Sequence, residues 1–115
     1  MRLAKIEKFS LEMIAGAVDR FGWPGARPQL ERFVGSPLVV SGKVRKVVRR
    51  DAQCKLVIET DDVPGFVVFA DCLNDAETVR ARKIRKGSSA AVCGVYVSSG
   101  WSAVCVADCR LLNVI

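Results

Sequence analysis

Between residues 37 and 112 the chain alternates apolar and polar positions over five short stretches, the pattern of half-buried β-strands. In the first stretch, Leu38, Val40 and Val44 share an apolar face, while the opposite face becomes basic. Gly42 in the middle of this stretch predicts a bend or bulge that lets a long strand curl. The predicted strands are residues 37–48, 53–60, 65–72, 89–97 and 101–109.

A polar and basic segment, NDAETVRARKIRKG (residues 74–87), separates the third strand from the fourth. We expect it to be a helix that Gly87 ends as a C-cap. Arg49 to Ala52 are predicted to form the first hairpin loop, and SSG (residues 98–100) the last. Five strands with one helix after the third is the order of an OB-fold, a partly open Greek-key barrel. The sequence therefore predicts a mainly β, five-stranded OB-fold.

The N-terminal third has helical rather than strand periodicity. Over residues 3–21 the apolar positions recur every three or four residues, which predicts an amphipathic helix packed on the barrel or on a second copy of the chain. FGWPGARP (residues 21–28) should break this helix, and a short helix over residues 28–34 should follow. We expect one domain over residues 1–115, with a helical extension (1–35) and a barrel (36–115).

Composition narrows the chemistry that this chain can perform. It has no histidine, so Ser–His–Asp and Cys–His catalysis cannot operate within it, and no recognised Gly-rich phosphate loop occurs. Its five cysteines form no CxxC pair and lie mostly in apolar strands, which favours reduced thiols and a cytoplasmic setting. We expect no enzymatic activity and no cofactor.

Acidic residues cluster around two turns, where they could bind a hard cation or simply favour the turn and the helix start. The second interpretation is preferred, so no metal site is predicted; the residues concerned are Glu59, Asp61, Asp62, Asp71, Asp75 and Glu77. No apolar run approaches the ~18 residues that a membrane span requires, and charges interrupt the N-terminus where a signal peptide would be apolar. We expect no membrane association.

Several segments match a known group of domains. LVVSGKVRKV, FVVFADC, IRKGSSAAVCGVYV and AVCVADCRLL, over residues 33–112, resemble the bacterial tRNA_anti-like family of OB-fold domains. The glycine in VSGKV, the KG before the fourth strand and the DCRLL ending are the nearest points. The resemblance implies nucleic-acid binding, by analogy with anticodon-binding OB domains.

OB domains bind ligands across strands 2 and 3, between the loop joining strands 1 and 2 and the loop joining strands 4 and 5. Cations in and beside the first loop could contact phosphates, and aromatic residues near the second could stack on bases. The predicted nucleic-acid site is Lys43, Arg45, Arg49, Arg50, Phe69, Tyr96 and Trp101. Phe66 competes with Phe69 for the outward position, and Tyr96 and Trp101 could instead pack on the barrel.

Charge supports a polyanion as the ligand. Eighteen Lys and Arg residues against twelve acids give a net charge of +6, and ten of the eighteen fall in two short stretches. The first stretch contains the four cations of the predicted site together with Lys46. The second could be another basic surface or only a solvated helix face; it comprises Arg80, Arg82, Lys83, Arg85 and Lys86.

Two functions from different classes follow. The first is a non-enzymatic OB-fold that binds single-stranded DNA or RNA with low sequence preference. The second is a small protein-interaction module, an inhibitor or adaptor of the kind that mobile elements encode, docking on a larger protein or nucleoprotein complex. An exposed apolar patch on the N-terminal helix would favour the second, or a homodimer through that helix.

Overall fold

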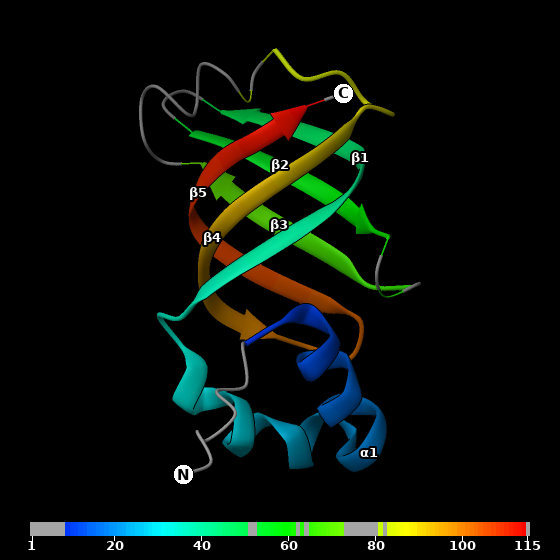
Figure 1. Cartoon of the computed structure of the whole chain (residues 1–115), viewed down its shortest axis with the longest axis vertical. Coiled ribbons are helices and arrows are strands. Elements are labelled where there is room, and N and C mark those ends of the chain that lie inside the picture. The colour runs from blue at the N-terminus through cyan, green and yellow to red at the C-terminus, as the bar shows by residue number, and fades with distance from the viewer. Residues whose placement is uncertain are drawn as a thin grey trace, which may run out of the picture.

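The computed structural model describes residues 9–50, 53–61, 63, 65–72, 81 and 83–114. Five strands close into a barrel in the order β1-β2-β3-β5-β4, in which β3 and β5 are parallel and the other pairs antiparallel (Figure 1). The strands are β1 (Pro37–Arg50), β2 (Gln53–Thr60), β3 (Val67–Cys72), β4 (Ser89–Ser99) and β5 (Ala103–Val114). This confirms the predicted OB-fold barrel. Most of the helix expected at residues 74–87 lies outside the described residues. Its end is described, and there the prediction is wrong: residues 83–87 form turns and coil, so no helix extends to Gly87.

The interior is formed mainly by alternate side chains of the strands. In β2 and β3 buried positions alternate with half-buried or exposed ones along the whole element, as the hydrophobic pattern predicts. Leu56, Ile58, Val68 and Val104 are completely buried. Because burying one such side chain contributes about 1.5–3 kcal/mol, this core holds the barrel closed.

β1 belongs to both halves of the barrel and bends between them. Gly42 pairs with Thr60 of β2 and with Ala90 of β4, and a Cβ at this position would overlap the backbone carbonyl of Glu59. The glycine is therefore required by close backbone approach. The bulge expected near it lies further along, at Arg45, where the pairing with β2 shifts register.

The first hairpin is tighter than predicted. The sequence pattern places Arg49 and Arg50 in the loop, but both lie in β1, where they pair with Cys54 and Gln53. Only residues 51 and 52 remain to connect the strands, the shortest common length for a hairpin. The ladder thus continues to the rim of the barrel and fixes the backbone of Arg49.

The N-terminal helix α1 (Leu11–Leu30) starts later and extends further than its apolar spacing indicates. The hydroxyl of Ser10 accepts a hydrogen bond from the Met13 amide at 3.3 Å and caps the helix. Phe9, predicted to be helical, precedes the helix and stacks on Phe33 at 4.6 Å between ring centroids. Residues 3–8 lie outside the description.

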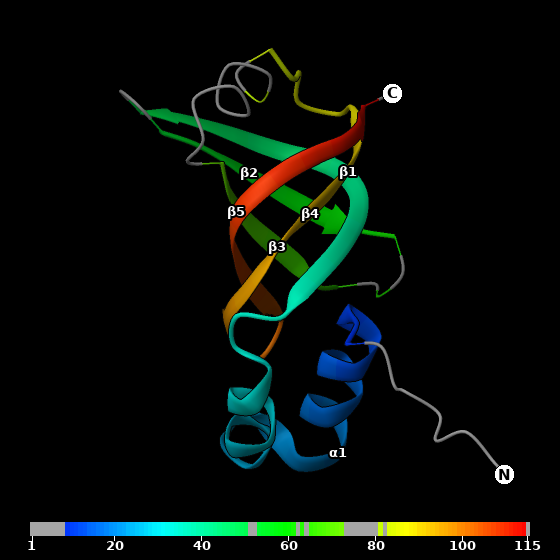
Figure 2. The same cartoon turned by 60° about the vertical axis from the view of Figure 1, so that its left-hand side comes forward.

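The predicted breaker segment only kinks α1. Gly22 alone departs from helical geometry (φ +70°), and the helix resumes because Pro24 falls in the first turn after the kink, where its missing N–H is not needed. A 3₁₀ turn (Glu31–Phe33) follows. Figure 2 shows both arms of α1 below the end of the barrel where β1 begins and β4 meets β5. No helix in the described part of the chain is long and apolar enough to span a membrane.

Candidate nucleic-acid interface

A groove of about 940 Å³ lies across the outer faces of β1, β2 and β3 and reaches the start of β5. Its floor is apolar, and basic side chains surround it. The floor residues are Val57, Val67 and Phe69, and the cations are Arg45, Lys46, Arg49, Lys55 and Lys86. The groove therefore combines a cationic margin with an apolar, partly aromatic base.

Strand alternation builds the floor. Val57 of β2 pairs directly with Phe69 of β3, so their side chains lie next to each other on the outer face. Phe69 is half-buried, whereas Phe66 is only 8% exposed and belongs to the core. The expectation that one of these two phenylalanines faces outward is confirmed, and Phe69 is the one.

The bulge in β1 places two cations side by side. Val44 faces the core opposite Ile58, and after the extra residue Arg45 the next pair is Lys46 with Val57. Arg45 and Lys46 are consequently both exposed, although regular alternation would have turned one of them inward. This arrangement concentrates positive charge at the β1 side of the groove.

Lys55 is a groove cation that the sequence-based site omits. It lies on the outer face of β2 and forms an ion pair with Asp71 of β3 at 3.7 Å. The alternation of β2, with Cys54, Leu56 and Ile58 inward, already places Lys55 and Val57 outward together, so the pattern contains the signal for both.

Lys86 comes from the second basic stretch and is brought to the groove by backbone contacts. The Gly87 amide donates to the Val44 carbonyl at 2.7 Å, and the Val44 amide donates to the Ser88 carbonyl at 2.7 Å. The Arg49 guanidinium donates to the Ile84 carbonyl at 3.3 Å. Arg49 therefore also holds the segment that carries Lys86 against the barrel end.

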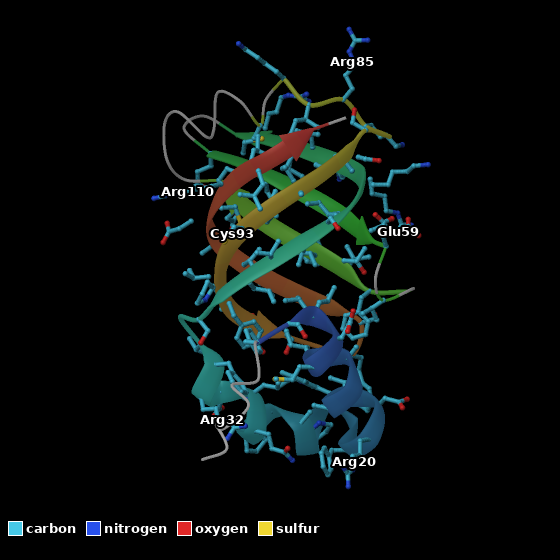
Figure 3. The ribbon with its side chains drawn as sticks, in the orientation of Figure 1. Arg20, Arg32, Glu59, Arg85, Cys93 and Arg110 are labelled. Carbon is cyan, nitrogen blue, oxygen red and sulfur yellow. The ribbon has the colours of Figure 1, made fainter. Side chains whose placement is uncertain are left out.

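The other predicted cations either do not line the groove or have side chains outside the described residues. Lys43 is exposed on β1 but does not line the groove. Lys83 and Arg85 are exposed at the barrel end, and Figure 3 shows Arg85 pointing away from the strands. The side chains of Arg50, Arg80 and Arg82 lie outside the described residues.

The structure does not bring the other two predicted aromatic residues to the groove. Tyr96 is 2% exposed, with its hydroxyl 2.6 Å from the Ser99 hydroxyl, and burial raises its pKa. Its ring contacts the Phe9 ring edge-on, with 5.1 Å between the ring centroids, so Tyr96 is part of the hydrophobic core. Trp101 is 63% exposed at the β4–β5 hairpin and borders a separate hollow against α1.

The opposite side of the barrel differs in character. We call the outer surface formed by the first half of β1, by β4 and by the end of β5 the back face. Its exposed large apolar side chains are Val39, Val97 and Leu112, at 51%, 47% and 54% exposure. Arg110 extends from the edge of this face, beside the half-buried Cys93 (Figure 3).

Burial limits the reactivity of three of the five thiols. All five cysteines are reduced thiols, and Cys54, Cys72 and Cys109 are buried. Burial first, and then the nearby Cys72, raise the pKa of Cys109 to about 12, so this thiol stays protonated near neutral pH. In the described part of the chain, no group of three or more His, Cys, Asp or Glu residues is placed to hold a metal ion.

Comparison with known proteins shows which fold this chain has, but not the family to which it belongs. No family model and no curated protein matches the chain. Among solved structures it resembles the S. pombe Stn1–Ten1 complex (TM-score 0.54, 15% identity, 72% of this chain and 68% of that one). It also resembles Pyrococcus horikoshii asparaginyl-tRNA synthetase (TM-score 0.57, 18% identity), covering 96% of this chain but only 24% of the synthetase.

An OBody, AM1L10, bound to hen egg-white lysozyme is a third similar structure (TM-score 0.52, 14% identity, 71% of this chain and 83% of that one). At such identities the likeness extends to the fold and no further. The resemblance to the tRNA_anti-like family stays a prediction, because no family model supports it. The chain is a mainly β protein with an OB-fold barrel and an N-terminal helix.

Proposed function

We propose that this protein binds single-stranded nucleic acid, DNA or RNA, with low sequence preference and without catalysing a reaction. The observation that carries the proposal is the groove across β1, β2 and β3, where cations surround an apolar floor that contains Phe69. In this proposal the chain acts as one cytoplasmic domain, with residues 36–115 supplying the barrel and residues 1–35 the helical extension.

The groove combines the two interactions that single-strand binding requires. Arg45, Lys46 and Lys86 contact phosphates, which supplies affinity that is independent of sequence and sensitive to salt. One base stacks on Phe69, and a stacked base contributes about 1–3 kcal/mol whatever its identity. A duplex keeps its bases stacked on each other, so it cannot use the floor and should bind more weakly.

Fluorescence anisotropy with labelled (dT)12, (rU)12 and a 12-base-pair duplex tests this proposal across a salt series. We expect single-strand binding that exceeds duplex binding and weakens as salt rises. The variant Lys46→Ala should lower the salt slope of log K by about 0.7 for each phosphate that the protein no longer neutralises. Arg110→Ala removes the same charge at the edge of the back face and serves as the matched control. Equal effects of the two variants would contradict the proposal.

A protein-interaction module is the second candidate, because the back face exposes Val39, Val97 and Leu112. These exposed apolar side chains lie on the barrel, whereas Leu11, Ile14 and Val18 of α1 are buried. A homodimer through α1 would have to use what the helix leaves exposed, such as Phe21 at 45%. Sedimentation of the free chain as a dimer, together with failure to bind any oligonucleotide at low salt, would favour an inhibitor or adaptor role.

A further inference from the structure

A second concavity, of about 320 Å³, lies between the first arm of α1 and the β4–β5 hairpin. Its walls are small or aromatic and include a single charged side chain. The residues that line it are Ala15, Val18, Asp19, Gly22, Phe66 and Trp101. Its volume is at the lower end of the range of about 300–1,000 Å³ for small-molecule pockets, which suits one flat group such as a nucleobase.

This hollow adjoins the groove. Val67 and Ser102 line the groove, and they are joined by a hydrogen bond from the Val67 amide to the Ser102 carbonyl at 3.0 Å. The residues just before them, Phe66 and Trp101, line the hollow. A single-stranded nucleic acid that lies in the groove and continues past the β4–β5 hairpin therefore reaches the hollow with its next base.

The Trp101 ring lies against the kink in α1. At Gly22 the backbone has φ +70°, which L side chains rarely adopt, and a Cβ there would lie 3.4 Å from the Trp101 ring. The ring thus rests against the kink while 63% of the residue stays exposed. An indole in this position can stack on an incoming base.

Asp19 makes the hollow selective for groups that donate hydrogen bonds. A carboxylate only accepts hydrogen bonds, and its two oxygens suit two adjacent donors. Among the four bases, only guanine offers two adjacent N–H donors, N1–H and N2–H₂, on its Watson–Crick edge. A guanidinium side chain has a similar pair of donors, but continuity with a cationic groove favours nucleic acid over a basic peptide.

We propose that this hollow is a guanine pocket for the base that leaves the groove at the hairpin, with Trp101 stacking on the base and Asp19 accepting from its Watson–Crick edge. The inference rests on the proposed single-strand binding. It adds one selective position to an otherwise sequence-tolerant site.

The test compares (dT)12 with the same oligonucleotide carrying one terminal dG, at either end, or one terminal dA. We expect the dG at one end to tighten binding roughly tenfold, which corresponds to about 1.4 kcal/mol, and dA to give no such gain. Asp19→Asn should abolish the dG preference. Glu12→Gln changes the charge of α1 equally, away from the hollow, and should retain the preference.

The outcomes separate this inference from the proposed function. Salt-sensitive (dT)12 binding with no dG preference, or with a preference that Asp19→Asn leaves intact, overturns the guanine pocket and leaves the groove model standing. Absence of binding to every oligonucleotide overturns both. A dG gain that disappears in Asp19→Asn and persists in Glu12→Gln supports the pocket.

Discussion

The groove face and the back face of one barrel share β1 and β5 but differ in chemistry. The second half of β1 pairs with β2 and displays Arg45 and Lys46 beside an apolar floor. The first half pairs with β4 and displays Val39. Closing the barrel requires only that the inward side chains be apolar, so the outward ones are free to differ. Their difference therefore points to function, and the cationic face is the one suited to a polyanion.

Gly42 lies where β1 pairs with both β2 and β4, so it connects the two faces. Of the substitutions considered, Gly42→Ala should have the largest effect on stability. A Cβ there overlaps the Glu59 carbonyl and forces β1 away from β2. We expect a loss of several kcal/mol in the free energy of unfolding, measured by urea denaturation. Gly16→Ala is the matched control, because nothing lies within 4 Å of its added Cβ. It should be neutral or stabilising by about 0.5–1 kcal/mol, and equal losses in both variants would contradict the close-approach argument.

Alkaline pH should loosen the β4–β5 contact that shapes the back face. Cys109 packs there so tightly that a Cβ on Gly94 would lie 2.6 Å from its sulfur. Its pKa rises from 9.0 to about 12 on folding, mainly through burial, so the stability it contributes is complete below pH 9 and is lost as pH rises toward 12. We expect Tm to fall by several degrees over this interval. Cys109→Ala should show a smaller fall, and an identical fall would exclude this thiol as a cause.

Phe69→Ala tests stacking on the groove face. Loss of one stacked base should weaken single-strand binding by about 1–3 kcal/mol, with the salt slope unchanged because no cation is removed. Val39→Ala, on the back face, should leave affinity as it is. Anisotropy titrations of both variants decide the point: a weaker complex with Val39→Ala than with Phe69→Ala would show that the ligand binds the back face instead.

The smallest effect is expected from making the back face polar. Val39→Ser with Val97→Ser changes exposed side chains only, so unfolding free energy and oligonucleotide affinity should each move by less than about 0.5 kcal/mol per substitution. Binding isotherms and urea curves measure both quantities. A large loss of affinity would show that the back face takes part in binding, and the contrast between the faces would fail.

The sequence predicts the strands well because alternation is a local property. The inward positions of β2 follow from period two alone. Period two also places Phe66 and Phe69 on opposite faces, but it does not tell which of them faces outward. The extent of α1 is less predictable, since Gly22 and Pro24 resemble breakers but occupy one kink and one first turn. Whether a proline ends a helix depends on its place in the turn, which composition does not give.

The site is less predictable than the fold, for two physical reasons. A bulge at Arg45 shifts every later residue of β1 by one position, so simple alternation misplaces the side chains beyond it. The grouping of Lys86 with β1 depends on hydrogen bonds between Val44 and residues 87–88, which are distant in sequence. Position near a loop also suggests that Tyr96 is exposed, whereas packing against Phe9 buries it.

An NMR titration of ¹⁵N-labelled protein with (dT)12 tests most directly which face binds. We expect amide shift changes to gather at residues 45–49, 55–57, 67–69, 86 and 102–103, around the groove. The amides of Val39, Cys93 and Val97 on the back face should stay unperturbed. Shift changes centred on the back face, with the groove amides unmoved, would contradict the central claim that the cationic face holds the strand.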